Sequence, residues 1–96
     1  DFFLTIAKKD NFYILKNPNL FSVDISGYAI RTVEGGVQNL PRYIIKRGEE
    51  IILTKKAKGL NFDFGVRVIE LKELKIENKQ IELLDNVGNI IFILNE

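Results

Sequence analysis

Four pieces of the sequence decide its fold: FYILKNP at 12–18, VDISGYAI at 23–30, LP at 40–41 and IKRGEEIIL at 45–53. Each piece reads as a strand that meets a turn: apolar residues suited to a strand stand next to residues that favour turns. Pro18 has no N–H for a β-ladder and restricts Asn17 to extended geometry, so a strand over 12–16 ends there. Asp24 and Ser26 can bond nearby backbone N–H groups, and Gly27 accepts a positive φ. The pattern predicts short strands that meet tight turns.

The composition favours an all-β domain. The chain has 96 residues, of which 46% are hydrophobic and 28% charged. These values are ordinary for a soluble globular protein, and the length suits one domain over residues 1–96. Ile occurs fourteen times and Ala only three times. Because β-branched residues suit the half-buried surface of a strand and Ala favours helices, we expect strands throughout.

The rest of the chain extends this pattern. Residues 2–7 alternate as a first strand would, and residues 28–33 and 50–54 read as further strands. Residues 80–84 and 89–94 flank a turn with Gly88, which is typical of a β-hairpin. Residues 66–77 fit period two better than a helical stripe, so we expect strand or extended structure there and keep a helix as the alternative. The chain is therefore predicted to be a β-sandwich or barrel.

The predicted core consists of apolar side chains on the inward faces of these strands. The candidates are Leu4, Ile6, Ile14, Ile25, Ile30, Ile45, Ile51, Leu53, Ile81, Leu83, Ile90 and Phe92.

In order and spacing, these pieces resemble the lamin tail domain family, an intermediate filament tail-like domain, in its prokaryotic type. The resemblance rests on Asn17-Pro18 followed by a segment from Val23 to Tyr28, on the turn over 45–49, and on the closing hairpin over 80–89. Tyr28 stands where the family usually has Trp. The family's Asn-x-Gly-Asp before the hairpin is replaced by residues 77–80. Since each of these residues also serves a turn or a core in any sandwich, an unrelated β-sandwich is the alternative.

The resemblance implies an immunoglobulin-like β-sandwich of about seven or eight antiparallel strands. It also implies a non-catalytic interaction or tethering module, which would bind a protein partner or other domains of the same polypeptide. The Ile- and Lys-rich composition suggests a prokaryotic source. We therefore expect part of a larger surface or secreted protein, located extracellularly or at the cell surface. Because there is no Met, Asp1 is not a natural start, and we expect a domain excised from a longer polypeptide.

The residue types present argue against an enzyme. The chain has no His and no Cys, so the usual general base and the commonest metal ligands are missing. Ser22 and Ser26 lie at predicted turns. The stretch from Asp85 to Asn89 has too few oxygen ligands for a dedicated Ca²⁺ site and reads better as a hairpin turn. No cofactor, catalytic or metal site is expected. No apolar run approaches the roughly 20 residues that span a membrane.

One charged stretch stands out as a possible contact surface. Residues 42–58 hold six cations against two acids, a balance of +4, in a chain of net charge +1. The cations are Arg42, Lys46, Arg47, Lys55, Lys56 and Lys58. A partner with anionic groups would meet them here, and a nucleic-acid-binding β domain is the alternative function. A solvated edge guarded by Lys side chains is the simpler interpretation.

Overall fold

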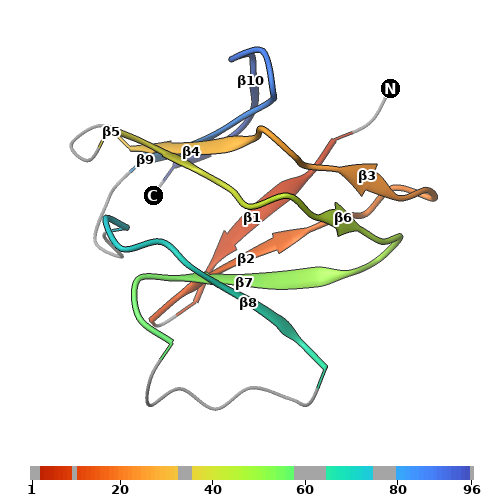
Figure 1. The fold of residues 1–96 in the computed structure, drawn as a ribbon, viewed down its shortest axis with the longest axis horizontal. Helices are drawn as coiled ribbons and strands as arrows, with labels where there is room; N and C mark the ends of the chain where they lie inside the picture. The colour runs from red at the N-terminus through yellow and green to blue at the C-terminus, as the bar shows by residue number, and fades with distance from the viewer. Residues whose placement is uncertain (1–2, 10, 33–35, 58–64, 75–79, 96) are drawn as a thin grey trace.

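The computed structural model describes residues 3–9, 11–32, 36–57, 65–74 and 80–95. Figure 1 shows two four-stranded sheets and a small two-stranded pair, with strand orders β1-β2-β7-β8, β10-β9-β4-β5 and β3-β6. The strands are β1 (Thr5–Lys8), β2 (Tyr13–Lys16), β3 (Val23–Asp24), β4 (Ala29–Thr32), β5 (Gly36–Asn39), β6 (Ile44–Ile45), β7 (Glu50–Thr54), β8 (Arg67–Glu70), β9 (Gln80–Leu84) and β10 (Ile90–Asn95). The described residues include no helix long and apolar enough to cross a membrane.

The all-β, sandwich-like architecture agrees with the prediction, but the number and direction of the strands do not. The described residues form ten strands rather than seven or eight, and β7 pairs with β8 in parallel. The register runs from Ile51 opposite Arg67 to Thr54 opposite Glu70. Residues 55–66 separate the two strands, which is about the dozen residues that a parallel crossover requires. Within 66–77, strand β8 covers only Arg67–Glu70 and is followed by a turn, in which the Leu74 N–H donates to the Leu71 carbonyl at 2.9 Å. Residues 75–77 lie outside the described residues.

The core lies between the two main sheets and includes nine of the twelve predicted side chains. These nine are Leu4, Ile6, Ile25, Ile30, Ile45, Ile51, Leu53, Ile81 and Leu83. The core also holds Tyr13, Leu15, Tyr28, Leu40, Ile69, Leu71 and Leu74, which are at most 6% exposed. Tyr28, which follows the turn over 24–27, is thus buried in the core.

Three core predictions were wrong, for two reasons. In β2, Tyr13 and Leu15 point into the core, so Ile14 faces outward and is only half-buried. Side chains alternate between the faces of a strand, and the prediction was therefore out of phase by one residue. In β10, an irregularity between Ile90 and Phe92 shifts the register. Ile90 is 46% exposed, and Phe92 is only partly buried against the core.

The predicted turn over 24–27 is present and is set by local hydrogen bonds. The Ser26 N–H donates to Asp24 Oδ1 at 2.9 Å, and the Tyr28 N–H donates to the Ile25 carbonyl at 3.0 Å. Gly27 has a φ of +83°, and a Cβ built there would lie 3.1 Å from the Asn86 Cβ. Glycine is therefore required both for its backbone conformation and for its missing side chain.

Asn17 and Asn19, called here the asparagine cluster, join three segments of the chain. Asn17 is fully buried, and its Nδ2 donates to the carbonyls of Phe21 and Ile45, each at 2.9 Å. Its Oδ1 accepts from the Asn19 N–H at 3.0 Å and from the Asn19 Nδ2 at 2.8 Å. Asn19 in turn bonds both backbone groups of Phe3, donating to the carbonyl at 2.7 Å and accepting from the N–H at 3.3 Å.

The backbone of Asn17 adds a fourth attachment. Its N–H donates to the Glu49 carbonyl at 3.0 Å, and its carbonyl accepts from the Gly48 N–H at 2.8 Å. The predicted turn over 46–49 is thus docked on Asn17. The Asn-Pro pair ends β2 as predicted, and the asparagine also ties that strand end to the β6–β7 turn.

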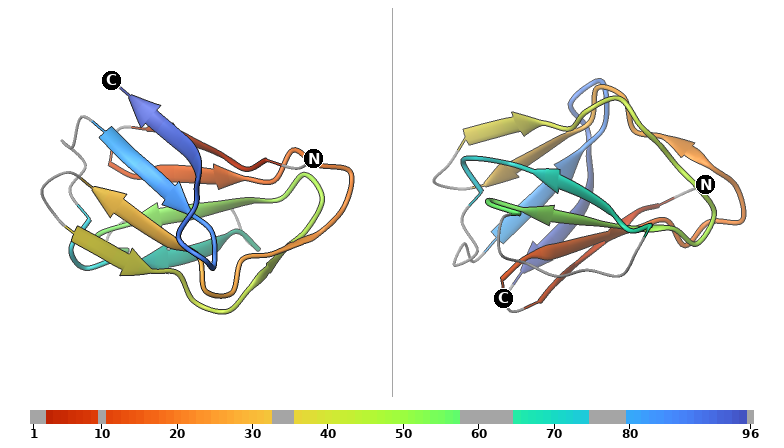
Figure 2. Two further views of the ribbon diagram at one scale, coloured as in Figure 1. Left: turned by 90° about the horizontal axis from the view of Figure 1, so that it is seen from above. Right: turned by 60° about the horizontal axis from the view of Figure 1, so that its bottom comes forward.

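The strand order places two outermost strands together on each side of the sandwich. β1 and β10 contact one another on one side. On the opposite side, the end of β5 and strand β8 line one groove, and Figure 2 shows both strands at that side of the sandwich. This second side is where the candidate site lies.

Candidate functional site

A groove of about 410 Å³ runs between the end of β5 and strand β8. One wall is formed by residues 39–41 and the other by residues 67–71. Leu40, Ile69 and Leu71 are buried at its base, whereas Asn39, Pro41 and Glu70 are exposed. A groove of this size with an apolar base and polar margins is typical of small binding sites.

Strand β8 presents unpaired backbone groups at this groove. The Leu71 N–H donates to the Thr54 carbonyl at 2.7 Å, on the side of β7. Backbone groups alternate in direction along a strand, so those of Ile69 also point toward β7, and those of Val68 and Glu70 point away from it. β8 is the outermost strand of its sheet, and no other described strand pairs with that side. Val68 and Glu70 therefore offer two N–H donors and two carbonyl acceptors.

Two side-chain contacts bracket the groove. At one end the Arg67 guanidinium lies over the Tyr43 ring, 5.2 Å from its centre, which is within the range of a cation–π contact. At the other end the Glu73 N–H donates to Gln38 Oε1 at 3.0 Å. Gln38 contacts Glu73, whereas Tyr43, further along the first wall, contacts Arg67 at the start of the second. The two walls therefore run in opposite directions.

Tyr43 is held in place by a second contact. Its hydroxyl donates to Glu49 Oε2, and Glu49 Oε1 also accepts from the Lys46 N–H at 2.8 Å. The hydrogen bond to Glu49 raises the pKa of Tyr43 above its usual range, with burial adding to the effect and Arg67 opposing it. The phenol therefore stays neutral and keeps donating at physiological pH.

The predicted anionic-partner residues do not form a single patch. Arg42, Lys46 and Arg47 are exposed before β7 begins, whereas Lys55 and Lys56 are exposed after it ends. The five residues of β7 separate the two groups by about 17 Å at 3.3 Å per residue. Figure 1 shows the two chain segments at opposite ends of β7. Lys58 lies outside the described residues.

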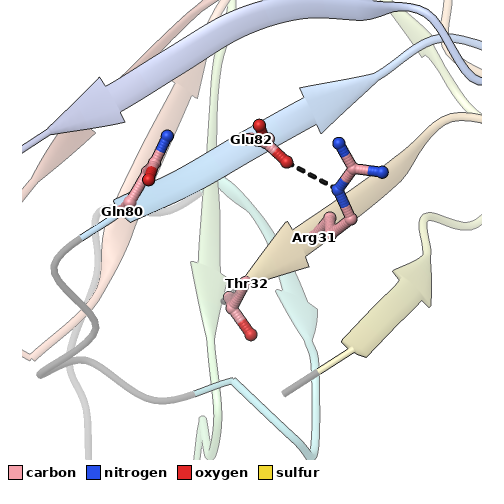
Figure 3. Close-up of a pocket in the computed structure, with 4 residues that line it drawn as sticks. All are labelled: Arg31, Thr32, Gln80 and Glu82. Atoms are coloured by element: carbon pink, nitrogen blue, oxygen red, sulfur yellow. Dashed lines mark hydrogen bonds and ion pairs between the residues drawn. The ribbon is translucent and has the colours of Figure 1, made fainter. Parts of the chain in front are cut away.

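A second cavity, of about 260 Å³, is lined by Arg31, Thr32, Gln80 and Glu82 on β4 and β9. Figure 3 shows that its two charged side chains face each other. The Arg31 Nε donates to Glu82 Oε1 at 2.5 Å, across the register of the two strands. Because Arg31 and Glu82 neutralise each other, this cavity offers little charge to a ligand. The groove is therefore the better candidate site.

The acidic turn at Asp85 is structural, as the sequence predicts. Asp85 Oδ1 accepts from the N–H groups of Val87 at 3.0 Å and Asn89 at 2.8 Å, which shapes the β9–β10 hairpin. Burial raises the pKa of Asp85, but these backbone bonds outweigh burial and bring the pKa below its usual range. Among the described residues, no three acidic side chains gather as metal ligands would.

Comparison with known proteins identifies no family for this chain. No family model matches it, and the search of curated proteins finds no similar sequence. The chain is therefore described by its fold, a sandwich-like all-β domain with a groove at one open side.

The groove was not predicted from the sequence, because its walls come from segments about 30 residues apart. The one signal within the sequence is the VRVIE stretch at 66–70, which carries a cation and an acid among apolar residues. Charged side chains are common on an outermost strand. Its position opposite Leu40 and Pro41 follows only from the sheet topology.

Proposed function

We propose that this chain is a non-catalytic interaction module of the lamin tail kind, with an immunoglobulin-like sandwich. In this proposal it forms part of a larger prokaryotic surface or secreted protein and tethers that protein to a partner. The sequence signatures at residues 17–18, 23–28, 45–49 and 80–89 support the family. The sandwich-like pair of sheets is consistent with it.

The observation that carries the binding function is the unpaired side of β8 beside a groove with an apolar base and polar margins. An extended peptide that adds to β8 would bond the backbone groups of Val68 and Glu70, and its side chains on one face would enter the groove. Strand addition itself does not require a charged partner. Arg67 and Glu70 at the groove margins would favour partner side chains of the opposite charge. We therefore assign an extended peptide segment of a protein partner as the ligand class.

The alternative function, nucleic-acid binding, would use the cations of residues 42–58. Their division between the two ends of β7 spreads the charge, so phosphate contacts would have to span both ends. Binding to DNA at low salt that weakens steeply as salt rises would favour this alternative.

The proposed function is tested by selecting peptides from a random display library on the immobilised chain. The affinity of an enriched peptide is then measured by calorimetry for the wild type and for Glu70→Pro. Proline removes an N–H that points away from β7, so the sheet keeps its own hydrogen bonds while the incoming strand loses one. We expect affinity to fall about tenfold or more, the worth of one well-made hydrogen bond.

Glu70→Ala is the matched control, since it removes the side chain and keeps the N–H. Its affinity for the peptide should stay within about twofold of the wild type, because an exposed side chain contributes little. Far-ultraviolet circular dichroism and thermal unfolding check that both variants fold. Equal binding by the proline variant, or failure to enrich any peptide, would refute strand addition at β8.

A further inference from the structure

The end of the molecule that carries the β2–β3 loop exposes three large apolar side chains, called here the apolar tip. Phe3 is 55% exposed, Leu20 76% and Phe21 51%. Asn19 bonds both backbone groups of Phe3, so Phe3 lies against this loop. These bonds bring Phe3 beside the loop that carries Leu20 and Phe21, and exposed apolar patches usually mark an interaction site.

The backbone beneath the apolar tip is already hydrogen-bonded within the protein. The asparagine cluster occupies the carbonyls of Phe3 and Phe21 and the N–H groups of Phe3 and Asn19. Satisfied polar groups lower the cost of moving a loop out of water. The same bonds hold the loop in one conformation, so little order is lost when the tip binds.

The charge beside the tip is positive. Lys46 and Arg47 are exposed in the β6–β7 turn, whose Gly48 bonds the Asn17 carbonyl. Within the described residues, no ion pair engages either of them. The acids of this turn are engaged: Glu49 accepts from Tyr43 and from the Lys46 N–H, and Glu50 lies 3.9 Å from Lys16.

The remaining charges at this end come from the strands next to the tip. Arg42 lies near enough to Asp24 to contribute to lowering its pKa, after the bonds from Ser26. The charge of Asp24 is therefore offset by Arg42. Lys46 and Arg47 remain exposed and can contact an anionic partner.

We propose that the apolar tip inserts into the interfacial layer of an anionic lipid membrane, with Lys46 and Arg47 at the headgroups. The β2–β3 loop projects at one end of the molecule beside the β6–β7 turn (Figures 1 and 2), a convex shape that suits insertion. Exposed Phe and Leu side chains next to Lys and Arg form the amphipathic arrangement of peripheral membrane anchors. This surface is distinct from the groove at β8, and neither proposal depends on the other.

The test places a fluorescent reporter in the tip of a chain that has no Trp. Phe21→Trp is mixed with vesicles made of equal parts phosphatidylcholine and phosphatidylglycerol, and with vesicles of phosphatidylcholine alone. We expect the emission to shift to the blue with the anionic vesicles. Val87→Trp is the matched control, because Val87 is 73% exposed in the β9–β10 turn. Its emission should not shift.

Co-sedimentation with the same vesicles separates insertion from simple charge attraction. Leu20→Ser with Phe21→Ser should weaken binding at least about tenfold, as expected for removing two apolar side chains from the contact. Lys46→Gln with Arg47→Gln should weaken binding to anionic vesicles and leave the unfolding temperature unchanged. No binding by the wild type, an equal shift of Val87→Trp, or full binding by the serine variant would each overturn the proposal.

Discussion

Replacing Asn17 with Ala tests whether the asparagine cluster holds this end of the domain together. The substitution removes four side-chain hydrogen bonds made by one fully buried amide. It leaves the carbonyls of Phe21 and Ile45 and the N–H of Asn19 without their partners. The backbone bonds of residue 17 to the β6–β7 turn remain, so the fold itself should survive.

The expected loss follows from these orphaned groups. Each buried polar group left unsatisfied costs about 1–3 kcal/mol. The bond to Phe21 is only partly buried, so water can replace one partner there at lower cost. We therefore expect the free energy of unfolding to fall by about 3 kcal/mol, the low end of the summed cost of the three orphaned groups. In a domain of this size, the melting temperature would fall by roughly 12–24 °C.

Urea unfolding followed by circular dichroism measures this loss. Asn11→Ala is the matched control, since Asn11 is exposed in a bend and should change the stability by less than about 0.5 kcal/mol. A loss below about 1 kcal/mol for Asn17→Ala would refute the reasoning, because the four bonds would then contribute no more than a single exposed one.

Three further predictions concern other parts of the domain. Gly27→Ala should lower the free energy of unfolding by about 2 kcal/mol, because the positive φ is strained for Ala and the added Cβ crowds Asn86. Gly48→Ala has open space around it and should lower it by only about 1 kcal/mol. Urea unfolding of both variants compares them, and the reverse order would contradict the packing argument. Leu83→Ala should cost about 2–5 kcal/mol and Ile90→Ala less than about 1 kcal/mol, as thermal unfolding can determine. Because the folded-state pKa of Tyr43 is raised, its contribution to stability is present below about pH 10, where the unfolded phenol begins to ionise, and is lost as the pH rises further. Between about pH 9 and 11, the stability of Tyr43→Phe should fall less than that of the wild type. An equal fall in both proteins would contradict the raised pKa of Tyr43.

Much of the local structure was predictable because it depends on local chemistry. Glu50–Thr54 and Gln80–Leu84 are strands with the predicted bounds, and the turns at 24–27 and 46–49 are where Asp, Ser and Gly residues placed them. The β-hairpin around Gly88 was also correct. These features need only the residue types and their immediate neighbours.

Features that depend on pairing between distant segments were not predictable. Every residue from 12 to 15, at the start of β2, is apolar or aromatic, so alternation could not decide whether Ile14 or Leu15 points inward. The parallel direction of β8 depends on where the chain re-enters the sheet after residue 57. The cations of 42–58 are close in sequence, yet β7 carries them to opposite ends. The groove, for the same reason, appears only when residues 39–41 and strand β8 are placed next to each other.

Amide hydrogen exchange of the chain with a display-selected peptide tests the central claim most directly. The backbone amides of Ile69 and Leu71 already face β7 and should exchange slowly with and without the peptide. The amides of Val68 and Glu70 face outward and should become protected only when the peptide is bound. Peptide binding that leaves these two amides unprotected would contradict the claim that the chain binds its partner by strand addition at β8.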